Sequence, residues 1–174
     1  VDPAKAQADP IEPTTASPDD AKLRFSFRYQ DWPEVLEWFA EQSDLSIQID
    51  LYPEGTFNYT DRHYYTPREA MDIMNRVLLT KGYTVVRTGR LLTLIDLEEE
   101  IPPQLVELVS VGKLDERGEF ELVKCLFQLA KWDPTEAAEE IGKLIGPQGA
   151  VTALPTAGQI LVTETGGKLC EIRN

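Results

Sequence analysis

Length, composition and charge exclude several classes of protein. The 174 residues suffice for one ordinary domain or two small ones, and a hydrophobic share of 42% is enough for most of the chain to fold. Seventeen lysines and arginines against thirty acidic residues give a formal net charge of −13, which disfavours nucleic acid because it repels a phosphate backbone. No stretch approaches the ~20 apolar residues of a membrane span, and no signal peptide opens the sequence. We expect a soluble segment, either a mature chain or an excerpt from a longer protein.

The first residues and the two cysteines set further limits. Residues 1–21 carry prolines among Ala, Thr and Asp with almost no large apolar side chains, which indicates a disordered, solvated linker outside the fold. Cys125 and Cys170 are too few and too far apart for a zinc site or a disulfide framework. Cys125 is interpreted as a small core residue, and a bridge between the two cysteines stays open.

The chain after the linker begins with a strand and a capped helix. Residues 23–29 alternate, with Leu23, Phe25, Phe27 and Tyr29 on the face expected to be buried. Asp31 and Glu34 are spaced as a capping box at the start of a helix that ends near Ser43. The apolar stripe of this helix is formed by Trp32, Val35, Leu36 and Phe39.

A second strand, a third strand and a second helix follow. Alternation over residues 45–51 and a turn before residues 56–60 predict the two strands. Thr66 and Glu69 open the helix as a capping box, and Gly82 ends it in a left-handed conformation. A hairpin over residues 83–97 turns at Gly89, so residues 23–97 predict the order β-α-β-β-α-β-β.

The acidic, proline-containing segment 98–118 breaks this pattern and could add one strand over residues 105–111. A second unit then repeats a shorter order: a strand from Glu119, a helix opened by residues 133–136, and strands at residues 150–154 and 159–163. The stripe of that helix comprises Ala137, Ala138, Ile141, Leu144 and Ile145. A last helix from Lys168 is expected to be cut off at the end of the chain.

The predicted fold class is therefore α+β, with two small domains. The first has the order β-α-β-β-α-β-β, and the second is KH-like, β-α-β-β-α with its final helix truncated. The predicted boundaries are a linker at 1–21, a first domain at 22–97, a connecting segment at 98–118 and a second domain at 119–174.

Catalytic and metal-binding patterns are weak. His63 is the only histidine, and no serine lies in a recognisable nucleophile motif, so a hydrolase ranks last. His63 and Asp61 supply two ligands where an enclosed metal needs four, and the acidic run at 98–100 lacks the alternation and glycine of a calcium loop. We therefore predict no catalytic residue, no metal, no cofactor and no small-molecule ligand.

The Gly146-Pro147-Gln148-Gly149 segment matches the Gly-x-x-Gly loop of KH nucleic-acid-binding domains. Here the loop joins a helix to a strand, whereas a KH clamp joins two helices. A helix stop followed by entry into a hairpin explains both glycines without a ligand. An RNA-binding module therefore ranks third among the functional hypotheses.

Aromatic and basic side chains before the second helix suggest a partner surface, because aromatic residues and arginine are enriched in protein interfaces. Trp38 falls outside the first helix stripe and is expected to be more exposed than Trp32 and Trp132, which are interpreted as hydrophobic staples beside helix starts. The candidate interface comprises Trp38, Tyr59, Arg62, His63, Tyr64 and Tyr65.

Residues 23–27, 35–42 and 45–50 resemble the first periplasmic domain of secretins, a short domain also found at the N-terminus of TonB-dependent receptors. The pattern continues at residues 55–57, 65–72, 78–83 and 91–96. Residues 120–174 look like the KH-like secretin domain that follows, on segments 126–129, 134–144, 149–154 and 159–165. Segment 98–118 is longer than a typical linker between those domains.

This resemblance implies a non-catalytic module for protein–protein interaction and ring assembly in an outer-membrane secretion or pilus channel. Its expected partners are other copies of itself and envelope secretion or pilus proteins, on the periplasmic side of a Gram-negative-type envelope. Membrane contact would come only through a pore-forming part beyond Asn174. The alternative is an envelope signalling domain of the TonB-dependent receptor type, which does not normally carry a KH-like second domain.

Overall fold

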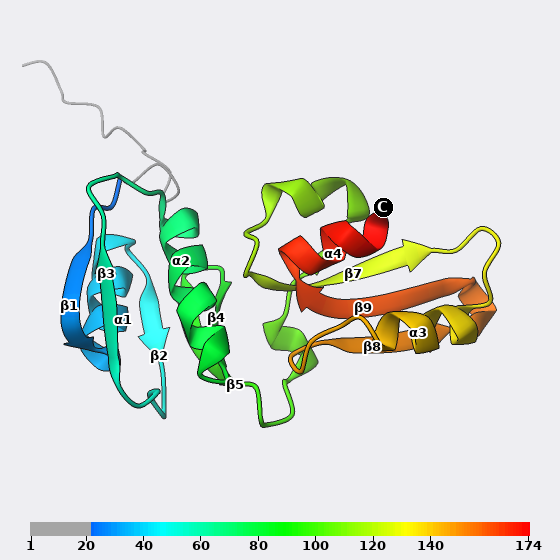
Figure 1. Cartoon of the computed structure of the whole chain (residues 1–174), viewed down its shortest axis with the longest axis horizontal. Coiled ribbons are helices and arrows are strands. Elements are labelled where there is room, and N and C mark those ends of the chain that lie inside the picture. The colour runs from blue at the N-terminus through cyan, green and yellow to red at the C-terminus, as the bar shows by residue number, and fades with distance from the viewer. Residues whose placement is uncertain (1–21) are drawn as a thin grey trace, which may run out of the picture.

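The computed structural model describes residues 22–174, so the linker predicted at 1–21 lies outside the described residues. These residues form two small α+β domains that stand side by side and are joined by one connecting segment (Figure 1). Each domain has its own hydrophobic core, and the predicted fold class is confirmed.

The first domain follows the predicted order of strands and helices. Its strands β1 and β3 form an antiparallel pair, and β2, β5 and β4 form a second sheet in that order, with β2 parallel to β5. The elements are β1 (Ser26–Asp31), α1 (Trp32–Gln42), β2 (Ser46–Gln48), β3 (Thr56–Thr60), α2 (Pro67–Thr80), β4 (Tyr83–Thr88) and β5 (Leu91–Asp96).

The core of this domain lies between the two sheets and the two helices. The predicted stripe of α1 is buried as expected, with Trp32, Val35 and Leu36 at 0% exposure. Trp32 packs against Phe57 of β3 at a ring-centroid distance of 4.9 Å. Burying aromatic side chains of this size supplies a large share of the stability of a small domain.

Two expectations for the first strand and helix are wrong. Tyr29 is 81% exposed, because a bulge between Phe27 and Gln30 interrupts the alternation and places Tyr29 at a φ of 51°. Its N–H donates to Asn58 Oδ1 at 2.6 Å. Asp31 does occupy the N-cap of α1, but its side chain makes no capping hydrogen bond.

Helix α2 is held to its sheet by a buried asparagine. The predicted capping box of Thr66 and Glu69 is present, and Gly82 has the expected positive φ of 83°. Within the helix, Asn75 is fully buried and its amide pairs with both backbone groups of Val85 in β4: Nδ2 donates to the carbonyl at 3.0 Å and Oδ1 accepts from the N–H at 2.7 Å.

We predict that Asn75→Ala lowers the free energy of unfolding by about 2–4 kcal/mol, because it leaves two buried backbone groups of Val85 unpaired and opens a cavity. Thr88→Ala, at an exposed position of the same strand, should change stability by less than about 0.5 kcal/mol. Urea denaturation of both variants checks this, and equal effects would contradict the role given to Asn75.

The second domain is a four-stranded sheet in the order β6-β7-β9-β8, with both of its α-helices on one face. The predicted β-α-β-β-α order is formed by β7 (Leu122–Gln128), α3 (Pro134–Gly142), β8 (Ala150–Leu154), β9 (Gln159–Thr165) and α4 (Gly166–Arg173). In segment 98–118 only β6 (Leu108–Val109) is a strand, shorter than the one expected over 105–111, and it pairs in parallel with β7. Short 3-10 turns precede and follow it.

The core of the second domain confirms some side-chain expectations and corrects others. Asp133 caps α3 by accepting from the N–H groups of Thr135 and Glu136, and Cys125 is a free thiol buried in the core. Leu144, expected in the helix stripe, is 60% exposed because α3 ends at Gly142. Trp132 is 63% exposed and is therefore no hydrophobic staple.

Candidate functional site

The predicted partner surface is built around one carboxylate in the loop after β3. Asp61 accepts hydrogen bonds from the Tyr65 hydroxyl, from His63 Nδ1 at 2.6 Å and from the N–H groups of Arg62 and His63 at 2.6 and 3.0 Å. The hydroxyls of Tyr65 and Tyr59 are 3.1 Å apart. The loop is thus fixed by contacts among its own residues.

These hydrogen bonds shift the pKa values of their partners. The hydroxyl of Tyr65 and the donors of His63 favour the carboxylate form and hold the pKa of Asp61 well below its usual range. The same hydrogen bond raises the pKa of Tyr65 above that of a free tyrosine. In the described residues the imidazole of His63 bonds to Asp61 alone, and no group of three or more metal-ligating side chains is found there.

The six residues of the predicted interface fall into two groups. Arg62, His63 and Tyr64 are exposed, and the side chain of His63 reaches 82%. The others are half-buried: Trp38 packs edge-on against Phe27 at 5.3 Å, and Tyr59 and Tyr65 both contact Phe25. Trp38 is therefore less exposed than its position outside the helix stripe suggested, and a partner contact at these residues stays a prediction.

The domain junction was not anticipated from the sequence. Helix α2 presents Arg68, Asp72 and Arg76, spaced by four residues, to the segment that leads into β7. Arg68 donates to the Glu116 carbonyl at 2.7 Å, Asp72 Oδ1 accepts from the Phe120 N–H at 2.7 Å, and the Arg76 guanidinium lies 5.7 Å from the centre of the Phe120 ring. A polar stripe with this spacing ordinarily indicates a solvated face, so the sequence alone does not predict this contact.

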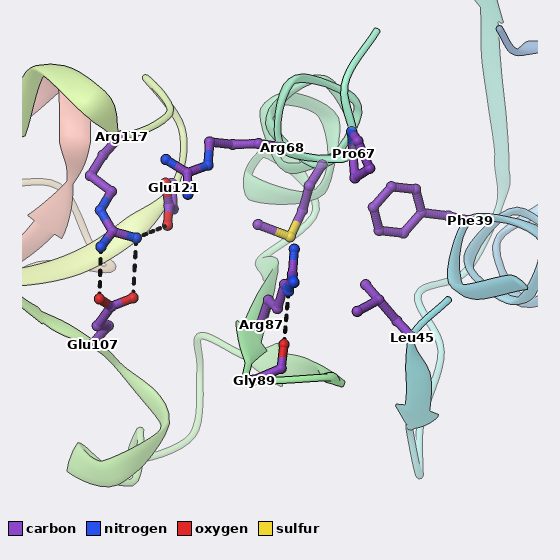
Figure 2. Close-up of a pocket in the computed structure, with 10 residues that line it drawn as sticks. Phe39, Leu45, Pro67, Arg68, Arg87, Gly89, Glu107, Arg117 and Glu121 are labelled. Carbon is purple, nitrogen blue, oxygen red and sulfur yellow. Dashed lines mark hydrogen bonds and ion pairs between the residues drawn. The ribbon is translucent and has the colours of Figure 1, made fainter. Parts of the chain in front are cut away.

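A cavity of about 240 Å³ lies beside this junction (Figure 2). Phe39, Leu45 and Met71 of the first domain line one side. On the other, Arg117 is paired with Glu107 at 2.7 Å and with Glu121 at 3.3 Å. The charge of Arg117 is thus neutralised within the cavity wall. Burial alone would lower the pKa of Arg117, but the two carboxylates outweigh it and raise the pKa.

Asp72 is the most constrained residue of the junction. Gly118 lies so close to the Asp72 carboxylate that a Cβ at this position would overlap it. Burial raises the pKa of Asp72, and the charges of Glu119 and Glu121 act in the same direction, against the N–H groups of Phe120 and Glu119. Burial therefore disfavours the charged form of Asp72, and the two N–H groups offset only part of this effect.

This raised pKa gives a pH-dependent prediction. The folded state holds the proton of Asp72 more tightly than the unfolded chain, so its contribution to stability is fully present below the unfolded pKa of about 3.9 and declines as pH rises through the folded pKa. Asp72→Asn keeps an oxygen acceptor for Phe120 without the charge. We expect this variant to be more stable than the parent near pH 7, with a difference that narrows towards about pH 4.

Urea denaturation at several pH values measures this difference, with Asp50→Asn as the control at an exposed position of the same domain. An Asp72→Asn variant that is less stable than the parent at neutral pH would show that the negative charge, and not only the acceptor, holds the junction.

The Gly-x-x-Gly loop is occupied from within the protein. Glu164 of β9 is fully buried, and its carboxylate accepts from the Gly146 N–H at 2.7 Å, from Gln148 Nε2 at 2.6 Å and from the Thr165 N–H at 2.8 Å. Gly149 also faces this carboxylate, at a distance that leaves no room for a Cβ. A nucleic-acid phosphate bound at this loop would need the Gly146 N–H, which already donates to Glu164. This weighs against a KH-type RNA function.

We predict that Glu164→Ala lowers the free energy of unfolding by about 3 kcal/mol or more, because three donors to a charged acceptor lose their partner in the protein interior. Glu139→Ala, exposed on α3, should cost less than about 0.5 kcal/mol. Thermal denaturation compares the two, and a loss similar to that of the control would contradict a structural role for Glu164.

Comparison with known proteins identifies the fold. No family model and no curated protein sequence matches the chain. A chain of the Klebsiella pneumoniae type II secretion system outer membrane complex, with PulD, PulS and the PulC HR domain, superposes with a TM-score of 0.68 at 16% identity, over 84% of this chain and 25% of its own length. The N-terminal domain of the secretin XcpQ from Pseudomonas aeruginosa matches at a TM-score of 0.38 and 16% identity, over 88% of this chain and 62% of its own.

A third match is the GspC–GspD complex of the type II secretion system from enterotoxigenic Escherichia coli, with a TM-score of 0.38 and 16% identity over 88% of this chain and 96% of the other. The likeness is one of fold: the two domains share their fold with the type II secretion system chain matched at a TM-score of 0.68, in agreement with the secretin resemblance. In the described residues no helix is long and apolar enough to span a membrane.

Proposed function

We propose that this chain is a non-catalytic module for protein–protein interaction and ring assembly in a secretin-like secretion or pilus channel, on the periplasmic side of the envelope. The observation that carries the proposal is the shared order and packing of both domains with the secretion-system chain matched at a TM-score of 0.68. That complex contains further secretion proteins, which makes envelope secretion components the expected partners here.

The proposed units are a first domain at residues 22–97 and a second at 119–174, linked by segment 98–118. Two separate hydrophobic cores support this division. The proposed contact surface consists of the six predicted interface residues. The exposed Arg62, His63 and Tyr64 would contact the partner. The half-buried Trp38, Tyr59 and Tyr65 would support them from below.

Self-association through such a surface is expected to be weak in isolation. Each copy carries a formal charge of −13, so two copies repel one another, and this repulsion falls as salt is added. In a ring, each contact is reinforced by the others, and modest pairwise affinity suffices.

We predict that the 174-residue chain self-associates with a Kd of roughly 0.1–1 mM, more strongly at about 0.5 M salt than at about 0.05 M. Sedimentation velocity between about 10 µM and about 1 mM measures this. Arg62→Glu with Tyr64→Ala should lower the association at least threefold, because the pair removes an aromatic contact and adds another negative charge.

The control is Arg90→Glu with Tyr29→Ala, which makes the same change of charge and also removes an exposed tyrosine, at other positions of the first domain. A chain that stays monomeric up to about 1 mM at both salt concentrations contradicts the assembly role and favours a monomeric signalling domain.

A further inference from the structure

Among the described residues, no α-helix covers one of the two faces of the sheet in the second domain. The side chains that point towards α3 and α4 belong to the hydrophobic core, among them Val123, Cys125, Ile160 and Val162. Residues between them point the other way and stand in cross-strand rows set by the register. After the buried pair of Leu122 and Thr165, three rows follow: Leu108, Lys124, Thr163 and Ala150; Leu126, Leu161 and Thr152; and Gln128, Gln159 and Leu154.

This open face differs in charge from the chain as a whole. The protein carries a formal charge of −13, yet none of the side chains in the three rows is acidic. Their single charge, on Lys124, donates to the Pro103 carbonyl at 2.6 Å. Leu126 and Leu161 stand directly opposite one another at its centre and are only partly buried.

The outer edge of this sheet is an unprotected strand. Among the described strands, β8 pairs with β9 alone. Exposed edges are normally guarded by charged residues, proline or a bulge, because their free backbone groups attract further strands. The β8 sequence Ala-Val-Thr-Ala-Leu has no charge and no proline, and its register with β9 is continuous.

A groove of about 470 Å³ runs beside this edge, between the open face and the connecting segment. Leu97, Ile101 and Leu161 supply apolar lining, and Thr152 of β8 lies in its wall. Glu99 and Glu100 also line the groove, and both side chains are exposed and outside the ion pairs found among the described residues. Lys124 is the one cation in the lining and donates to the Pro103 carbonyl, so the groove combines apolar surface with a net negative charge.

We propose that the edge of β8 and this groove bind an extended segment of another protein in which apolar and basic side chains share one face, because they occupy every second position of the strand. The segment adds a fifth strand to the sheet through backbone hydrogen bonds to β8. Its apolar side chains pack towards Leu161 and its basic ones face Glu99 and Glu100. A second copy of this chain, with its formal charge of −13, fits the negative charge of the groove poorly. The proposal does not rest on ring assembly, because a monomer presents the same β8 edge.

The test is an NMR titration of the isotope-labelled chain with a short peptide in which valine and lysine take turns at every second position and threonine fills the positions between them. We expect chemical-shift changes at the amides of residues 150–154 and 98–103, and slower hydrogen exchange along β8. Glu99→Gln with Glu100→Gln should weaken the binding roughly fivefold, whereas the acidic twin of the peptide, with glutamate for lysine, should not bind at these amides.

The matched control is Glu34→Gln with Glu41→Gln, which removes the same charge from exposed positions of α1 and should leave the affinity unchanged. Equal weakening by both pairs, or shifts confined to other residues, overturns the proposal as non-specific attraction. Broadening of the 150–154 amides with rising concentration of the chain alone assigns the edge to a second copy, and overturns it as well. Association through the loop at 61–65 moves different amides and leaves this result unaffected.

Discussion

Helix α2 contacts strand β4 through one face and the segment before β7 through another, and the described structure depends on both contacts. Its buried face holds Asn75, whose amide replaces a missing backbone partner for β4. Its polar face carries the stripe of Arg68, Asp72 and Arg76, which meets the segment leading into β7. A change in the orientation of this helix therefore alters both the first sheet and the position of the second domain.

Each domain also contains one buried polar side chain that organises the backbone around it. Glu164 accepts a hydrogen bond from the backbone of the loop at residues 146–149, and Asn75 pairs with the backbone of β4. Both side chains satisfy backbone groups that have no hydrogen-bond partner within a strand or helix. Such groups add little net stability when they are paired, but leaving them unpaired is costly, so they specify a single arrangement. Gly149 leaves room for the Glu164 carboxylate and Gly146 for the side chain of Gln148, so contacts within the protein account for both glycines.

The order of elements could be predicted from the sequence because it rests on local rules. Capping residues such as Thr66 and Asp133, together with helical spacing of apolar residues, predict where α2 and α3 begin. What could not be predicted depends on tertiary contacts: the bulge that turns Tyr29 outward, the exposure of Trp132, and the pairing of Asp72 with Phe120, whose partners lie 48 residues apart. The sequence shows Asp61 and His63 two residues apart, but it does not predict the hydrogen bond that Asp61 accepts from the Tyr65 hydroxyl.

The two domains are joined by contacts of a different kind from those that hold each domain together. Each core is made of apolar side chains excluded from water, whereas the junction combines hydrogen bonds and a cation–π contact, several of them exposed, with a small number of apolar side chains such as Val86 and Leu122. Exposed polar contacts are individually worth about 1 kcal/mol or less, so the junction is weaker than either core. Interfaces of this type permit relative motion of domains while each domain stays folded. The angle between the two domains can then change without unfolding either core.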